Sequence, residues 1–201
     1  AAQSGVAFAV QPVVRLADAF GNLVATNGTV VTAAIAAGTG TLGGTPTAST
    51  VSGVATFAAL SITGVSGVNT LRFTSGVLTP DTTTTITIGA GAAARLAIVQ
   101  QPSPSAQNAV AFAQQPTVQL QDAAGNPVAQ AGVVVAAAIL TGTPALGGTV
   151  TATTNAGGLA TFTNLAITGL VGVRSLQFAG GVLTPVTSAT VTLTAGVATQ
   201  M

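Results

Sequence analysis

The chain contains no Lys, Glu, His, Cys, Trp or Tyr, and only 3% of its 201 residues are charged. An ordinary globular domain carries about 25% charged residues. The absence of cysteine excludes a disulfide scaffold. A formal net charge of +1 provides no field that would attract a polyanion, so we expect no nucleic-acid partner. The charged residues are Arg15, Arg72, Arg95, Arg174, Asp18, Asp81 and Asp122.

The missing residue types also remove the usual catalytic groups. Without His, Cys, Lys or Glu, a serine or threonine has no conventional activator. Asp18 and Asp81 could meet in the first half of the chain, but Val186 stands at the position of Asp81 in the second half. We therefore predict that the protein is not an enzyme, and that it has no catalytic, cofactor-binding or metal-binding residue.

Mean hydropathy is high, at +0.72, yet the apolar runs are short. The longest, Val133–Leu140, is one strand long, far below the about 20 residues of a spanning helix. We expect no membrane insertion by this segment. Residues 1–8 have neither a basic region nor a long apolar run, so they do not form an intact signal peptide.

The sequence consists of two copies of one repeat. Gln3–Phe8 reappears as Gln107–Phe112, and Asp18–Asn22 reappears as Asp122–Asn126. A repeat of about one hundred residues has the size of one small domain. We predict two immunoglobulin-like repeats: residues 1–92, which lack the first strand, and residues 93–201.

The local pattern of both copies is typical of β-strands. Apolar and polar residues alternate in Pro12–Asp18 and Pro116–Asp122, and turn residues follow at roughly ten-residue spacing. The alanine-rich runs 28–37 and 132–140 are short and follow no capping box, so we predict strands there too. The predicted fold class is all-β, with two tandem antiparallel β-sandwiches of about seven strands each.

Phenylalanines recur at matching positions and predict the cores. Phe8, Phe57 and Phe73 return as Phe112, Phe162 and Phe178, whereas Phe20 has no counterpart. Their neighbours of the same strand parity are apolar, and no Tyr or Trp is present to form a stacking surface for sugar or nucleic acid.

Two motifs have chemical interpretations that we weighed against structural ones. Gly38, Gly40 and Gly43 satisfy the dinucleotide-binding G-x-G-x-x-G pattern, but no helix or nearby acid follows, so we interpret them as a loop. Asp18 and Asp122 each open D-x-x-G-N, which predicts a turn closed by the aspartate. A calcium site would need more carboxylates than one per repeat.

Several of these segments together resemble a known family. Val13–Val24 with Thr117–Val128, Gly53–Gly64 with Gly158–Gly169, and the strand Leu96–Ser103 resemble bacterial immunoglobulin-like domains of the invasin and intimin group. The resemblance covers essentially the whole chain. It implies a spacer or stalk domain of a surface adhesin.

The two copies do not begin alike. Ala1 aligns with Ser105, so the first copy lacks the equivalents of Ala97–Pro104, most of an opening strand. We expect an unpaired sheet edge and an apolar groove in the first domain. Either the chain is a window from a longer array, which we favour, or a neighbour supplies the strand. The residues we single out for strand addition or contact between modules are Leu96, Ile98 and Val99.

Together these patterns favour a structural module of an extracellular bacterial fibre, stalk or adhesin, joined end to end with like modules. The alternative is a carbohydrate- or receptor-binding adhesive module that acts through its end loops. Its partners would be surface glycans or host proteins, whereas the partners of the structural module are like modules. Both functions predict an extracellular or cell-surface location and no cofactor.

Overall fold

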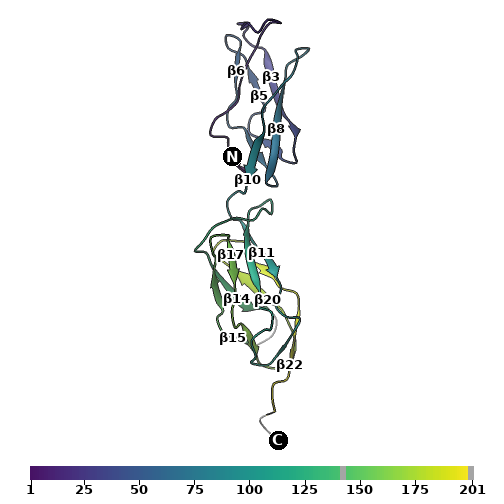
Figure 1. The fold of residues 1–201 in the computed structure, drawn as a ribbon, viewed down its shortest axis with the longest axis vertical. Helices are drawn as coiled ribbons and strands as arrows, with labels where there is room; N and C mark the ends of the chain where they lie inside the picture. Colours follow the sequence, from purple (N-terminus) through teal and green to yellow (C-terminus); the bar gives the residue numbers. More distant parts are fainter. Residues whose placement is uncertain (141–143, 199–201) are drawn as a thin grey trace. The chain divides into compact units, whose positions relative to one another are not determined.

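The computed structural model describes residues 1–140 and 144–198, and these residues contain strands and turns but no helix. Accordingly, the described part of the chain has no helix capable of crossing a membrane. The chain divides into two compact units, unit 1 (Ala1–Gly91) and unit 2 (Ala92–Met201). Figure 1 shows the strands of unit 1 in purple to teal and those of unit 2 in teal to yellow.

Unit 1 is built from one larger sheet, in the order β1-β10-β8-β3-β5 with β9 beside β8, and two short pairs, β2-β6 and β4-β7. All these pairs are antiparallel except β1 with β10. Its strands are β1 (Ala2–Gln3), β2 (Val13–Arg15), β3 (Val30–Ala37), β4 (Thr41–Gly43), β5 (Thr47–Ser49), β6 (Val54–Thr56), β7 (Ser61–Thr63), β8 (Gly67–Thr74), β9 (Asp81–Thr82) and β10 (Ile86–Gly89).

Unit 2 has the sheets β16-β14-β20-β21, β12-β22-β19, β11-β13-β17 and β15-β18. Again one pair, β12 with β22, is parallel and the others are antiparallel. Its strands are β11 (Arg95–Gln100), β12 (Ser105–Gln107), β13 (Thr117–Gln121), β14 (Val134–Ile139), β15 (Ala145–Gly147), β16 (Thr151–Thr153), β17 (Leu159–Thr161), β18 (Ala166–Thr168), β19 (Gly172–Arg174), β20 (Leu176–Ala179), β21 (Val186–Thr187) and β22 (Val191–Thr194).

The predicted all-β sandwich class is confirmed, and the alanine-rich runs are strands, namely β3 and β14. The strands are shorter and more numerous than about seven per repeat. Irregular residues divide some of the predicted strands into two shorter ones. For example, β8 is continuous in unit 1, whereas its counterpart in unit 2 is divided into β19 and β20.

Hydrogen bonds made by the same side chains recur in both units. The Gln11 side-chain amide donates to Phe8 O at 2.9 Å and its oxygen accepts the Leu60 N–H at 2.9 Å. Gln115 makes the same two bonds, to Phe112 O at 3.0 Å and from the Leu165 N–H at 2.9 Å. Each glutamine therefore joins the same two loops, and the two repeats have the same internal organisation.

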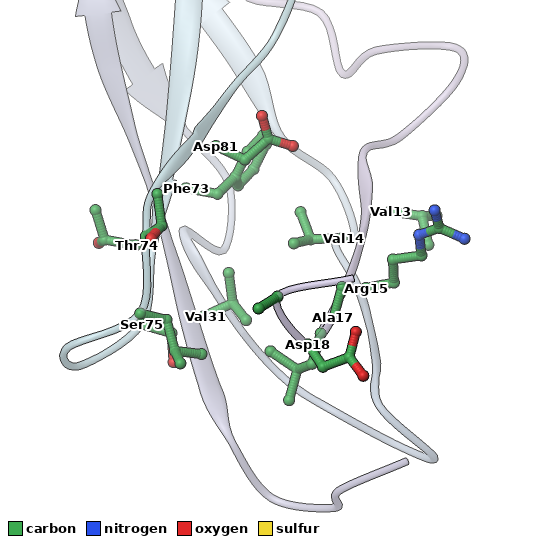
Figure 2. A pocket seen from close by; sticks show the side chains of 14 residues that line it. Val13, Val14, Arg15, Ala17, Asp18, Val31, Phe73, Thr74, Ser75 and Asp81 are labelled. Atoms are coloured by element: carbon green, nitrogen blue, oxygen red, sulfur yellow. The ribbon is translucent and has the colours of Figure 1, made fainter. Parts of the chain in front are cut away.

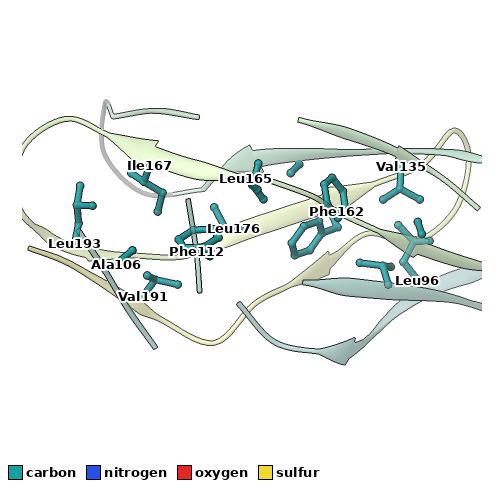
Figure 3. Packing of buried hydrophobic residues seen from close by; sticks show 14 of the residues in the cluster. Leu96, Ala106, Phe112, Val135, Phe162, Leu165, Ile167, Leu176, Val191 and Leu193 are labelled. Atoms are coloured by element: carbon teal, nitrogen blue, oxygen red, sulfur yellow. The ribbon is translucent and has the colours of Figure 1, made fainter. Parts of the chain in front are cut away.

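Each unit has its own core with phenylalanines at the predicted positions, and in each core two of the rings form a pair. Phe57 and Phe73 lie with ring centroids 5.2 Å apart, and Phe162 and Phe178 with centroids 5.1 Å apart. All four rings are buried. The other predicted core rings are Phe112, which is buried, and Phe8, which is partly buried, whereas the unmatched Phe20 is 91% exposed. Figure 3 shows the core of unit 2, with Leu96 beside Phe162 and Val135 at one end and Leu193 and Ile167 at the other.

Candidate functional site

Unit 1 contains an open groove with a volume of about 730 Å³. One wall is formed by residues 13–19, and the other by Val31, residues 73–75, Leu78, Thr79 and Asp81. In Figure 2, Val14 from one wall and Val31 from the other lie near the middle of the groove. We call this concavity the open groove.

The open groove exists because β2 has a partner on one side only. Within the described residues β2 pairs with β6 alone, in the register Val14↔Ala55. Its counterpart in unit 2, β13, pairs with β17 on one side and with β11 on the other. The sheet of unit 1 therefore ends one strand earlier than that of unit 2.

In unit 2, β11 occupies the space that is open in unit 1. It runs antiparallel to β13, with Leu96 opposite Leu120 and Ile98 opposite Val118. The Leu96 N–H also donates to Thr184 O at 3.0 Å. β11 is therefore hydrogen-bonded both to β13 and to the segment of Thr184, which correspond to the two walls in unit 1. Complete burial of a leucine side chain contributes about 1.5–3 kcal/mol to folding.

The singled-out residues of β11 do not all face the core. Leu96 is buried and Ile98 packs against the core, but Val99 is 56% exposed. Successive side chains of a strand point to opposite faces, so Leu96 and Ile98 share the inner face and Val99 lies on the outer one. Val99 therefore does not line the equivalent of the groove.

With a strand on one side only, β2 and the residue that follows it leave their apolar side chains partly exposed. Val118 and Leu120 of β13 are both 0% exposed, whereas their counterparts Val14 and Leu16 are only partly buried. The Leu16 N–H donates to Gly53 O at 2.8 Å, on the side of β6. Because backbone groups alternate along a strand, the N–H and C=O of Arg15 face the open groove.

Two carboxylates line the open groove, and the structure does not bring them together. In Figure 2, Asp81 lies beside Phe73 at one end and Asp18 lies beyond Ala17 at the other, with Val14 and Val31 between them. Asp81 Oδ1 accepts the N–H of Thr82 at 2.8 Å.

The carboxylate of Asp18 closes a turn, as its motif predicts. Its oxygens accept the N–H of Phe20 and of Asn22, both at 2.9 Å, and the Asn22 side-chain amide at 3.0 Å. The Asn22 side-chain amide, with the backbone amides, holds the pKa of Asp18 below its ordinary value. Gly21 supplies the positive φ of +85° that the turn needs.

The matching turn of unit 2 has the same bonds in a buried setting. Asp122 accepts the Asn126 N–H at 2.8 Å and the Asn126 side-chain amide at 2.7 Å, and both side chains are 3% exposed. Among the residues that the structure describes, no three Asp, Glu, His or Cys side chains gather where they could hold a metal ion. The two aspartates therefore have the turn role, with their acceptor atoms engaged locally.

The glycine motif lies in a loop that continues into a strand. Gly38 has φ of +106°, and Gly43 is the last residue of β4, so the run is not a loop throughout. The Gly40 N–H donates to Asn69 Oδ1 at 3.2 Å, and a Cβ at Gly38 would collide with the same side chain. The motif is followed by strand β5 and positions the buried Asn69.

One feature of the site was not apparent from the sequence. The second wall of the open groove comes from residues 73–81, and its counterpart includes Leu183 and Thr184. The signal available was the repetition of G-V-L-T-P at 76–80 and 181–185, which predicts a shared structural role but not which strand it contacts.

No protein-family model and no curated protein matches the chain. Solved structures do match. The D0–D1 domain of intimin is 18% identical with a TM-score of 0.37, and the match covers 85% of this chain and 83% of that one. The D00–D0 domain of intimin is 18% identical with a TM-score of 0.44, covering 63% of each chain. The adhesin InvE of Yersinia pseudotuberculosis is 21% identical with a TM-score of 0.38, and the match covers 90% of this chain but only 53% of InvE. At such identities the similarity concerns the immunoglobulin-like fold alone.

Proposed function

We propose that the chain is a structural module of an extracellular bacterial fibre, stalk or adhesin, in which like modules are joined end to end. The observation that carries this proposal is the repetition of one sandwich, down to its internal hydrogen bonds. The bonds of Gln11 and Gln115, and those of Asp18 and Asp122, are the same in the two units. Both copies therefore retain the residues that build the domain.

The polar side chains where chemistry would be expected have structural roles. Asp18 and Asp122 close turns, and Thr50 and Thr154 each join two loops. The Thr50 hydroxyl donates to Thr26 O at 2.7 Å and accepts the Thr29 N–H, and the Thr154 hydroxyl donates to Gln130 O at 2.8 Å and accepts the Val133 N–H. This pattern supports a load-carrying or spacing role over a catalytic one.

The surface carries exposed apolar side chains that could pack against neighbouring modules with equally few charges. Large apolar side chains are exposed in both units, among them Val77 and Val182, which stand fully exposed in the matching G-V-L-T-P loops. A surface with few charges depends little on electrostatic repulsion for its solubility and is prone to associate with copies of itself.

Negative-stain electron microscopy of the protein isolated from its natural source tests the proposal. We expect beaded fibres in which each bead is one sandwich. Isolated particles that cluster only when a glycan or a host protein is added would contradict the structural role and favour the adhesive alternative. Hydrolytic activity that Asp18→Asn abolishes in folded protein would contradict both.

A further inference from the structure

Strand β16 (Thr151–Thr153) is an edge of its sheet, because among the described residues it pairs with β14 alone. The Ala137 N–H donates to Val150 O at 2.8 Å, and the Thr154 N–H donates to Val133 O at 2.9 Å. Residues 150, 152 and 154 therefore bond to β14. Since backbone groups alternate along a strand, those of Thr151 and Thr153 face away from β14 and remain for a further strand.

The edge of the other sheet at the same corner of the sandwich is covered by its own turn. The Asn155 N–H donates to Leu159 O at 2.9 Å, and Asn155 Oδ1 accepts the Leu159 N–H at 3.1 Å, so the start of β17 is closed. Asn164 Oδ1 likewise accepts the Thr149 N–H, just before β16, at 2.9 Å. The stretch that stays open is residues 150–154, which we call the free edge.

The free edge lacks the features by which proteins usually protect a sheet edge. Such features are charged side chains, proline and β-bulges. Residues 150–154 read V-T-A-T-T, with no charge and no proline, and their pairing with β14 has no register shift. Threonine and valine are also among the residues that favour strands. The sequence of the free edge is therefore suited to pairing with another strand.

The outer face of the sheet beside the free edge is neutral. Thr151 and Thr153 are exposed on this face, and they pair with the exposed residues Ala136 and Val134 of β14. The next strand, β20, adds Gln177, where unit 1 has the exposed Arg72. A second sheet placed beside this one would meet no like charge on the outer face.

The free edge is complementary to itself. In an antiparallel pair, two opposite residues exchange both of their N–H···O bonds. If two copies of β16 meet with Thr151 of one opposite Thr153 of the other, the outward groups of all four threonines are satisfied. The two-fold axis then lies beside Ala152, and threonine faces threonine across the strands, a favourable cross-strand pair.

We infer that the free edge of unit 2 is a self-association site, whose partner is the free edge of a second copy of this chain. The two β16 strands pair antiparallel about the two-fold axis at Ala152. The sheet of β14, β16 and β20 then continues into the sheet of the second copy. The chains are joined side by side, which is a different contact from the end-to-end joining of modules proposed above.

The equivalent edge of unit 1 has the same layout but a less suitable sequence. The Ala33 N–H donates to Pro46 O at 2.8 Å and Val31 pairs with Ala48, so the backbone groups of Thr47 and Ser49 face outward. Pro46 and Ser49 stand where unit 2 has Val150 and Thr153, and both residue types fit a strand less well. The edge of β5 is therefore a matched control for the edge of β16.

A contact of one short strand pair is weak by itself. An interface smaller than about 1,200 Å² is typical of transient complexes, so we expect a dissociation constant of roughly 0.1–1 mM for two single chains. If the modules are repeated in a fibre or stalk, as proposed above, many such pairs act together and hold neighbouring fibres side by side. The pairing itself is tested on the single chain, independently of that function.

Sedimentation equilibrium of the full chain at increasing concentration measures the pairing. The double variant Thr151→Lys with Thr153→Lys places lysine opposite lysine and should raise the dissociation constant about tenfold or more. The control Thr47→Lys with Ser49→Lys adds the same charge at the edge of β5 and should change it by about twofold or less. Melting curves of both variants confirm that they are folded. A wild-type chain that stays monomeric up to about 1 mM would overturn the inference, as would equal effects of the two variants.

Disulfide capture tests the register, since the described residues include no cysteine. Opposite residues of a bonded antiparallel pair have Cα atoms about 5.5 Å apart, within the range of a disulfide. A mixture of a Thr151→Cys chain with a Thr153→Cys chain should therefore form covalent dimers under mild oxidation. Each variant alone should form few, because identical residues of the two copies are displaced by two positions, about 7 Å, along the strands. Capture in the single variants equal to that in the mixture would overturn the proposed pairing.

Discussion

Leu96 lies directly opposite Leu120 in the antiparallel pair of β11 and β13, and both side chains are buried. Leu16 holds the place of Leu120 in the first repeat, where β2 has no strand on its outer edge among the described residues. The side chain of Leu16 is accordingly only partly buried. The same sequence motif thus has two environments, which differ by one strand.

The paired phenylalanines should dominate the stability of each unit. Phe57→Ala or Phe162→Ala is expected to lower the free energy of unfolding by about 3–5 kcal/mol, because each leaves a cavity next to a partner ring. Phe20→Ala, at a position that is 91% exposed, should change it by about 0.5 kcal/mol or less. Urea denaturation followed by circular dichroism measures both. A large effect of Phe20→Ala would place that ring in a contact that the structure lacks.

Gly158 and Gly132 form a matched pair for a test of backbone packing. Both have positive φ, +75° and +86°, so alanine at either should cost about 1–2 kcal/mol in conformational strain. A Cβ at Gly158 would also collide with Val128 O and approach the Gln119 amide, whereas a Cβ at Gly132 meets open space. Gly158→Ala should therefore be clearly the more destabilising in urea titrations. Equal losses would mean that the loop around Val128 moves aside at no cost.

Acid should weaken the Asp18 turn. The pKa of Asp18 is lowered in the folded state by the Asn22 side-chain amide and by backbone amides. A lowered pKa means that the turn adds stability above the ordinary aspartate pKa of about 3.9, and that this stability is lost as the pH falls through the lower folded value. The difference in unfolding free energy between the wild type and Asp18→Asn should therefore be largest near neutrality and shrink in acid. A difference that stays constant from pH 7 to pH 2 would contradict this assignment.

Salt should have little effect on the protein. With only four arginines and three aspartates, attraction and repulsion between charges contribute little to stability or self-association. Melting temperature and sedimentation should change little between low and moderate NaCl, apart from the general strengthening of apolar contacts by excluded salts. Dissociation of assemblies on modest addition of NaCl would assign control of association to those few charges.

Strand positions and core rings were predictable because they depend on local alternation and on the repeat. Phe57 with Phe162, and Phe73 with Phe178, recur at fixed positions in strands and are buried in both units. The turns at Asp18 and Asp122 were predictable for the same reason, since aspartate and glycine act there on neighbouring backbone groups.

Features that depend on distant segments were not predictable. Gln119 lies between Val118 and Leu120, so the alternation of the sequence predicts that it faces solvent. In the structure it is only 7% exposed. Its side-chain amide donates to Gly157 O at 3.0 Å and to Gly158 O at 3.2 Å, from a loop that covers the strand. The second wall of the open groove was not predictable either, because no local sequence pattern indicates which strand residues 73–81 approach.

The most direct test of this account is amide hydrogen exchange of Arg15 and Gln119 in the full chain, measured by NMR. The Gln119 N–H lies between two strands, β11 and β17, on the side of β11, whereas the Arg15 N–H faces the open groove. We predict slow exchange for Gln119 and fast exchange for Arg15. Protection of Arg15 equal to that of Gln119 in the free chain would contradict the open edge of unit 1.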